Sequence, residues 1–521
     1  EFANVSRNIS FWSSYINPGP SSRPVSLPVQ VNLNDVGLSQ AQATTIPLNF
    51  NAQGRATISV NYPDAGQLEL NARYVGSAAT NDPGLVMTGS DRFIRRPAGL
   101  CVRTAATCNA ADASCPAFAV AGDPFPLTIT AHSWGNGNLN YCENPLTPNF
   151  ERSAIPLQLQ LLAPAAGTLG SQGVAQYNHT RNSQAQTVVQ QSVSESGVFR
   201  FGTAAFSYLG MTEQVPQAWS NSTGRFVPAR FRLSELELLR TPTCSANDNL
   251  YMRQNLALSY RLTALNRQGN VTTNYHSGFV RATPVLGAAS LSPAQNLADR
   301  LHFQANAGSW AAGSAFYTTA SLAGESQLWL NRQSNGQPDG PYENTVLALQ
   351  VLDGENPQLA AIESPDFNIL IPGCTGTQCN SRRLATYTLR YGRLALDNAF
   401  GPEFDALPLV LRAEYWQQGR FITNPFDQCS VVESGRLSWV SGDFNLAASG
   451  GSTVLANGIS SPLALLLAAP GEAGSARYRY QAPPWLTYDW AQSGSYNQHP
   501  QNEVIFGRYR GNPRQIFWRE R

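Results

Sequence analysis

The chain of 521 residues contains no lysine, and all 35 of its basic residues are arginines. This absence excludes Schiff-base chemistry on a lysine side chain and Lys–Asn isopeptide cross-links. Charged residues make up only 13% of the chain, against roughly 25% in an average soluble protein. The net charge of +1 gives no field that would attract nucleic acid or an anionic membrane. We therefore expect no nucleic-acid partner.

Long hydrophobic runs and long helical patterns are also missing. The most apolar run, residues 463–469, is far shorter than the roughly 20 residues that span a bilayer, and it predicts a buried strand. We therefore expect no membrane span. Two stretches, 290–300 and 357–362, favour a short helix or helical turn. The polar start at Glu1 carries no signal-peptide pattern, so a mature form or a fragment is expected.

What the sequence does contain is turn residues and alternation. It has 42 glycines and 34 prolines. Residues 57–62 and 67–74 alternate between apolar and polar side chains around a turn at 63–66. A chain of this length needs several cores. The pattern predicts an all-β protein built of tandem Ig-like antiparallel β-sandwiches, elongated and disulfide-bonded.

The expected modules are 1–97, a cysteine-rich 98–243, 244–435 with insertions, and 436–521. Proline-containing joints at 93–97 and 224–231 support the first boundaries. A weak repeat, read as strand, Gly-Asn turn and strand, relates residues 126–141 to residues 260–275 and favours related modules.

Eight cysteines occur, without a CxxC motif or a histidine at metal-ligand spacing, so disulfides are favoured over a zinc site. Short spacing favours the local pairs Cys108–Cys115 and Cys374–Cys379. The pairs that are then left over are Cys101–Cys142 and Cys244–Cys429, the last of which closes a very long loop.

Several motifs follow one another in a specific order along most of the chain. Motifs that begin with glycine occur at 54–66 and 89–97, followed by Gly-Arg-Phe-Val-Pro at 224–228 and Asn-Gly-Gln-Pro-Asp-Gly-Pro-Tyr at 335–342. Further motifs occupy 391–401 and 414–429, and the end of the chain reads Trp-Arg-Glu at 518–520. This order closely resembles the MshQ-like family, which is associated with type IV pili of the MSHA class in Gram-negative bacteria.

The resemblance implies an exported protein at the cell surface or outside the cell. It implies adhesion or a pilus-tip or accessory role, with minor pilins or other pilus components as partners. A surface glycan or a host or substratum ligand is a further candidate partner. Family members often carry a lectin-like domain upstream, which is absent here, so its ligand-binding role does not transfer to this chain.

The chemistry-bearing residues predict no enzyme, cofactor or metal. The five histidines lie in no HExxH motif and no nucleophile elbow. Glu403, Asp405 and Asp489 are weak glycosidase candidates that surface turns explain better. Asp339 and residues 353–356 are weak Ca²⁺ candidates that match no calcium loop.

Aromatic residues leave one alternative function, a secreted carbohydrate-binding module or carbohydrate-active enzyme. Tyr415, Trp416 and Trp490 are the candidate contacts to a ligand or partner, whereas Trp485 and Trp518 are expected in cores. Residues 514–518 predict a strand that closes the last module, and pairing with a neighbouring subunit is the less favoured reading.

Overall fold

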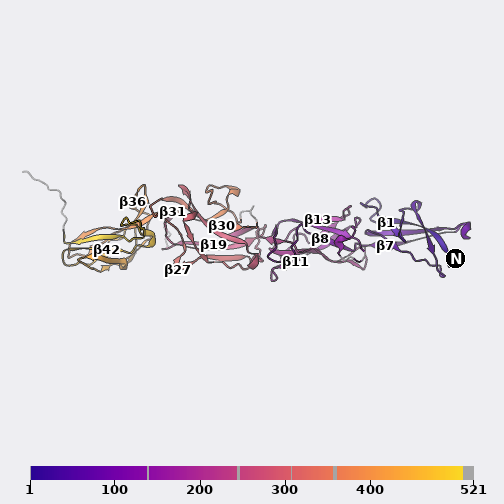
Figure 1. Ribbon diagram of the computed structural model, residues 1–521, viewed down its shortest axis with the longest axis horizontal. Coiled ribbons are helices and arrows are strands. Elements are labelled where there is room, and N and C mark those ends of the chain that lie inside the picture. The colour runs from indigo at the N-terminus through magenta and orange to yellow at the C-terminus, as the bar shows by residue number, and fades with distance from the viewer. Residues whose placement is uncertain are drawn as a thin grey trace, which may run out of the picture. The chain divides into compact units, whose positions relative to one another are not determined.

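The computed structural model describes residues 2–135, 137, 140–242, 247–306, 308–355 and 361–508. Its regular elements are β-strands and single-turn 3-10 helices (Figure 1), which confirms the predicted all-β fold. Over these residues no helix has the length and apolar character needed to cross a membrane. The chain divides into two compact units. Unit 1 comprises residues 1–229, 264–280 and 311–313, and unit 2 comprises 230–263, 281–310 and 314–521.

The first sandwich of unit 1 is made of two sheets. One sheet has the order β4 (Thr44–Asn49), β1 (Ser6–Asn17), β6 (Gly66–Val75) and β7 (Val86–Arg95), and the other has β3 (Asn34–Val36), β2 (Val29–Val31) and β5 (Val60–Asn61). Alternate residues of β1 are buried, and Phe11 packs with Val31 of the facing sheet in one core. Two 3-10 turns, η1 (Gln40–Gln42) and η2 (Ala78–Thr80), lie in connections.

The second sandwich of unit 1 surrounds a core rich in phenylalanine. One sheet has the order β13 (Gln186–Gln191), β10 (Phe125–His132) and β8 (Gly99–Arg103). The other has β12 (Gln176–His179), β11 (Arg152–Ala163), β14 (Gly197–Thr203), β18 (Arg225–Val227) and β9 (Ala117–Val120), with β17 (Ala218–Trp219) beside β14. A small hairpin joins β15 (Phe206–Ser207) to β16 (Gln214–Val215), and the 3-10 turns are η3 (Tyr141–Glu143) and η4 (Ser277–Phe279).

A buried carboxylate lies where the two sandwiches of unit 1 meet. Asp64 is 1% exposed and accepts hydrogen bonds from the backbone N–H groups of Ala65 at 2.7 Å and Asn149 at 3.1 Å. The side-chain amide of Asn149 donates to the Val25 carbonyl and to the Tyr62 hydroxyl. Burial raises the pKa of Asp64 to about 6, although these N–H groups act in the opposite direction.

We expect Asp64 to make unit 1 less stable as pH rises from about 4 to about 6. The folded state keeps the proton to about pH 6, whereas the unfolded chain loses it near the ordinary value of 3.8. The stabilisation that Asp64 contributes is therefore complete below the pKa of the unfolded chain. It is lost as the pH rises through the pKa of the folded state, a change in the free energy of unfolding on the order of 2–3 kcal/mol. The Asp64→Asn variant removes this dependence.

Urea unfolding of Asp64→Asn and wild type at pH 4 and pH 7 measures the difference. The exposed Asp91→Asn variant is the matched control. Parallel pH profiles of Asp64→Asn and wild type would contradict the expectation.

Unit 2 begins with a larger set of sheets. One has the order β19 (Arg230–Arg240), β21 (Leu256–Leu265), β26 (Ser314–Thr319) and β25 (Ala305–Asn306). A second has β20 (Asn249–Tyr251), β31 (Ser381–Arg390), β30 (Tyr342–Asp353), β22 (Ala282–Ser292) and β23 (Ala294–Asn296). Two strand pairs join β24 (Leu301–Phe303) to β29 (Leu328–Leu330) and β27 (Ser321–Leu322) to β28 (Glu325–Ser326). The 3-10 turns are η5 (Ala298–Arg300) and η6 (Gly376–Gln378).

The C-terminal sandwich of unit 2 has its own core, in which Leu411 and Tyr478 meet Phe506. One sheet has the order β32 (Gly392–Leu396), β35 (Leu411–Gln417) and β36 (Arg420–Thr423). A second has the order β33 (Ala399–Gly401), β43 (Gln501–Phe506), β42 (Gly474–Tyr480) and β38 (Leu437–Gly442). A third has the order β34 (Leu407–Pro408), β41 (Leu466–Leu467) and β39 (Ala448–Ser449). A further pair joins β37 (Val431–Glu433) and β40 (Ser452–Val454), and the 3-10 turns are η7 (Ser434–Arg436) and η8 (Pro484–Leu486).

The structure corrects three details of the sequence analysis. Among the described strands, three pairs are parallel rather than antiparallel: β18 with β9, β20 with β31, and β33 with β43. The helical turn expected within residues 290–300 is present as η5, although most of this stretch forms the β22–β23 hairpin. Only Leu466–Leu467 of the apolar run is a strand, and Leu463 is 73% exposed. The apparent repeat ends in η3 in one copy and in a turn at 273–274 in the other, so its second half is not a strand.

Two predictions fall partly or wholly outside the described residues. The closing strand expected at 514–518 lies outside the described residues, and the described strand nearest that end of the chain is β43. Most of the short helix expected at 357–362 lies there as well.

Two of the disulfides are the local pairs that short spacing favours, and a third is one of the two pairs that were left over. Cys101–Cys142, Cys108–Cys115 and Cys374–Cys379 are bonded, with Cα–Cα distances of 5.0, 5.8 and 5.3 Å. Cys429 is also disulfide-bonded, whereas its expected partner Cys244 lies outside the described residues. Each bond lowers the conformational entropy of the unfolded chain and so stabilises the folded state.

Candidate functional site

Of the three aromatic contact candidates, Tyr415 is the most deeply buried. Tyr415 and Trp416 are neighbours in β35, so their side chains point to opposite faces. Tyr415 is 6% exposed, which hides it from an external ligand, and its hydroxyl donates to Gln417 at 2.7 Å. Trp416 is half-buried against Phe421, and Trp490 is 36% exposed.

Trp490 forms part of an aromatic cage around Arg393. The Arg393 guanidinium carbon lies 3.8 Å from the ring centre of Phe421, 4.7 Å from that of Trp490 and 5.1 Å from that of Tyr488. Glu414 accepts from Arg393 at 2.7 Å. This cation–π arrangement explains the position of Trp490 and occupies one face of its ring.

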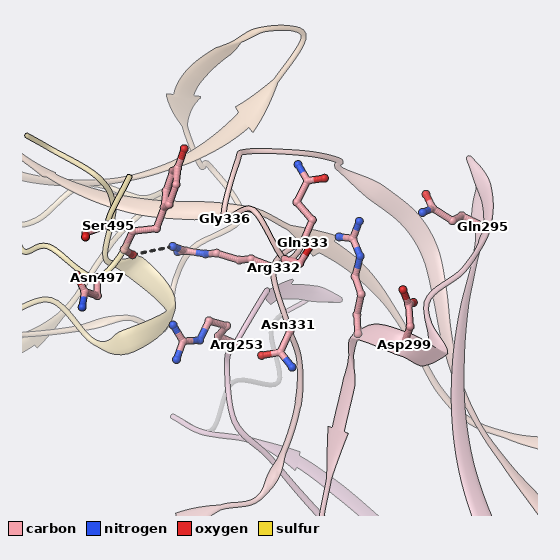
Figure 2. A pocket seen from close by; sticks show the side chains of 12 residues that line it. Arg253, Gln295, Asp299, Asn331, Arg332, Gln333, Gly336, Ser495 and Asn497 are labelled. Atoms are coloured by element: carbon pink, nitrogen blue, oxygen red, sulfur yellow. Dashed lines mark hydrogen bonds between the residues drawn. The ribbon is translucent and has the colours of Figure 1, made fainter. Parts of the chain in front are cut away.

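One cavity of unit 2 is polar and rich in arginine. Its volume is about 670 Å³, within the roughly 300–1,000 Å³ range of ligand pockets. Figure 2 shows Arg253 and Arg332 directed toward Ser495 and Asn497, with Gln295 and Asp299 on the opposite side. The walls come from the segment after β20, from β23 and η5, from residues 331–336 after β29, and from residues 495–497.

Backbone contacts hold these walls in place. Arg253 has a φ of 70°, and its N–H donates to the Leu330 carbonyl at 2.6 Å, which ties it to β29. Asp489 accepts from the N–H groups of Ser493 at 2.8 Å and Gly494 at 2.7 Å. Asp489, considered above as a glycosidase acid, is therefore the carboxylate that shapes the turn leading to Ser495.

Arg332 is the most unusual residue of the cavity because it is 7% exposed and forms no ion pair with any described carboxylate. Its Nη2 donates to the carbonyls of Gly392 at 2.8 Å and Trp485 at 2.9 Å, and its Nη1 donates to that of Tyr496 at 3.4 Å. Its Nε has no hydrogen-bond partner. Burial lowers the pKa of Arg332, and the neighbouring charge of Arg253 acts in the same direction.

Arg300 differs because its charge is already compensated. Its Nη1 lies 2.6 Å from a carboxylate oxygen of Asp339, which also accepts from the Tyr342 hydroxyl at 2.8 Å. Asp339, a weak calcium candidate from the sequence, is thus engaged in an ion pair. Among the described residues no group of three or more His, Cys, Asp or Glu side chains is placed to hold a metal ion.

The remaining chemical candidates are dispersed. Glu403 and Asp405 lie in the connection between β33 and β34. His132 is buried, with Nδ1 2.7 Å from the Asn144 carbonyl, and His302 stacks on Trp329 at 3.9 Å. Burial lowers the pKa of His179 to about 4, so this side chain is neutral at pH 7.

Sequence reasoning did not identify Arg253 or Arg332 as site residues. One signal lay close to them: the motif at 335–342 supplies Gly336 to the cavity wall and Asp339 to Arg300. The motif was informative about the chain's relatives, but nothing in its spacing indicates that an unpaired arginine lies beside it.

The solved structures that are similar to the chain include three proteins built of β domains. Invasin, a bacterial integrin-binding protein, matches 96% of this chain and 72% of its own at 7% identity, with a TM-score of 0.30. The I9–I11 tandem from titin matches 78% of this chain and 99% of its own at 7% identity, with a TM-score of 0.20. The D0–D1 domain of intimin matches 46% of this chain and 90% of its own at 12% identity, with a TM-score of 0.13. At these scores none of the three supports an argument about this chain.

Family comparison is more informative. No curated protein matches the chain. Models of the four domains of DUF6701, a domain of unknown function, match in sequence order: the first, Ig-like domain at 1–90, the second at 96–189, the third at 195–366 and the fourth at 390–521. None of these descriptions names MshQ or a pilus. The chain therefore belongs to the multi-domain DUF6701 family, whose function is unknown.

Proposed function

We propose that the chain is a non-enzymatic, exported surface protein of a Gram-negative bacterium that acts in adhesion or as a tip or accessory component of type IV pili. The observation that carries the proposal is the combination of disulfides with successive β-sandwich cores. Disulfides persist in oxidising compartments outside the cytosol. The order of motifs shared with MshQ-like proteins supports the pilus as the system.

The proposed partners are minor pilins or other pilus components. Strand β7 offers one place for docking, because it is an edge of its sheet and all but two of its ten residues are exposed. A partner strand can pair with such an edge through main-chain hydrogen bonds. The exposed side chains of Val86 and Met87 would contact that strand.

Fractionation of bacteria that express the tagged full-length chain tests the pilus association. We expect the chain to co-sediment with sheared pili, and to be lost from that fraction in an otherwise identical strain without the major pilin. An unchanged distribution in the pilin-lacking strain would exclude association with the pilus.

The contacts of Trp485 and Trp490 give no support to the alternative of a carbohydrate-active enzyme. Trp485 is partly buried against the C-terminal core, and Trp490 already contacts Arg393. A hydrolysis screen tests the enzymatic part of this alternative. Turnover of a glycan that disappears in Asp489→Asn would overturn the non-enzymatic proposal.

A further inference from the structure

The cavity of unit 2 contains positive charge that the protein leaves uncompensated. Its lining includes three arginines and one aspartate, the exposed Asp299. Arg300 is paired with Asp339, but within the described residues neither Arg253 nor Arg332 forms an ion pair. Two guanidinium groups on the same side of one cavity repel each other, and an anion placed between them removes that repulsion.

Arg332 provides an independent indication of a ligand. A guanidinium is seldom 93% buried without a carboxylate, and the three carbonyls that contact it leave Nε without a hydrogen bond. Its Cζ lies 4.1 Å from the ring centre of Tyr391, which fixes the plane of the group. The three carbonyls occupy both N–H groups of Nη2 and one of Nη1, so the second N–H of Nη1 is the charged donor that Arg332 can offer to a carboxylate.

The other polar groups of the cavity match hydroxyl groups. The Asn331 side-chain oxygen accepts from the Trp329 indole at 2.9 Å, which leaves the amide NH₂ as a donor. The Gln333 amide NH₂ donates to the Gln337 carbonyl at 2.9 Å, which leaves its oxygen as an acceptor. Hydroxyl groups both donate and accept, so a polyhydroxylated ligand satisfies both side chains.

We propose that this cavity binds an acidic sugar, with the sugar carboxylate held by Arg253 and Arg332 and its hydroxyl groups held by Asn331 and Gln333. This inference goes beyond the proposed surface role, since it names a ligand class and a site. Ser495 and Asn497 close the cavity on the side toward which both arginines point (Figure 2).

Isothermal titration calorimetry on the full chain tests the site with three probes. Methyl β-glucuronide carries both the carboxylate and the hydroxyl groups, methyl β-glucoside lacks the carboxylate, and succinate lacks the sugar. We expect the glucuronide to bind at least about tenfold more tightly than either comparison compound, because a charge-assisted contact or the hydroxyl contacts are lost in each.

Two variants assign the binding to the cavity. Arg253→Gln changes an exposed side chain to a shorter, neutral and polar one, so the fold is retained, and it should weaken glucuronide binding about tenfold. Arg55→Gln removes an exposed arginine of unit 1 and should leave binding unchanged. Equal affinity for glucuronide and glucoside, equal affinity for glucuronide and succinate, no measurable glucuronide binding, or unaltered binding in Arg253→Gln would each overturn the proposal.

Discussion

Replacing Phe226 with alanine is expected to lower the free energy of unfolding of unit 1 by about 3–5 kcal/mol. Phe226 is 1% exposed in β18, and its ring centre lies 5.4 Å from those of Phe118 and Phe125 and 5.5 Å from that of Phe199. The alanine variant leaves a cavity among these rings and removes four edge-to-face contacts, the fourth being to Phe201 at 6.1 Å. The loss should be confined to the second sandwich.

Hydrogen exchange followed by mass spectrometry resolves where the full chain is destabilised. Protection should fall in β10, β14 and β18, which surround Phe226, while the C-terminal sandwich keeps its protection. Phe404→Ala makes the same chemical change at a side chain that is 74% exposed, and it should alter stability by less than about 0.5 kcal/mol. Similar losses in the two variants would show that the aromatic core is not what stabilises this sandwich.

Replacing Glu195 with alanine is expected to cost about 3 kcal/mol and to release the 264–280 segment from unit 1. Glu195 is 4% exposed and accepts from the N–H of Ser196 at 2.9 Å, the N–H and hydroxyl of Thr273 at 3.0 and 2.9 Å, and the N–H of Asn274 at 3.1 Å. Without the carboxylate these donors lose their acceptor, which makes the deletion more costly than a surface change.

Exchange rates of the Thr273 and Asn274 amides report directly on this contact. They should rise strongly in Glu195→Ala and remain near wild type in Glu213→Ala, which removes a carboxylate 76% exposed and 3.9 Å from Arg96. If the two amides stay protected in Glu195→Ala, the carboxylate does not hold the segment.

The fold class followed from the sequence because alternation and turns are local properties. The stretch at 67–74 became β6, and the joint at 93–97 separates β7 from β8, which belong to different sheets. The three parallel pairs were missed because each joins strands distant in sequence. The start of the predicted module 244–435 was placed at Cys244. The boundary between units 1 and 2 falls between Ala229 and Arg230, inside the predicted joint at 224–231. The four-module division remains a prediction, and limited proteolysis would test it.

The site was less predictable, for physical reasons that Tyr415 and Arg332 illustrate. Adjacent strand residues face opposite sides, so sequence alone could not decide whether Tyr415 or Trp416 would be buried. Arg253, Arg332 and Asn497 come together through three separate connections. An arginine in a polar turn is usually solvated, and Arg332 is only 7% exposed because it contacts backbone segments that are distant in sequence, at Gly392 and Trp485.

The assignment of residues 264–280 and 311–313 to unit 1 affects the order in which the chain can fold during synthesis. A nascent protein usually completes its N-terminal domain before the next one emerges from the ribosome. Here the Glu195 carboxylate is translated 78 residues before Thr273, its partner. The Glu195 carboxylate of unit 1 therefore lacks its partners until residue 274 has been translated, and during this interval unit 1 is exposed to binding by a chaperone.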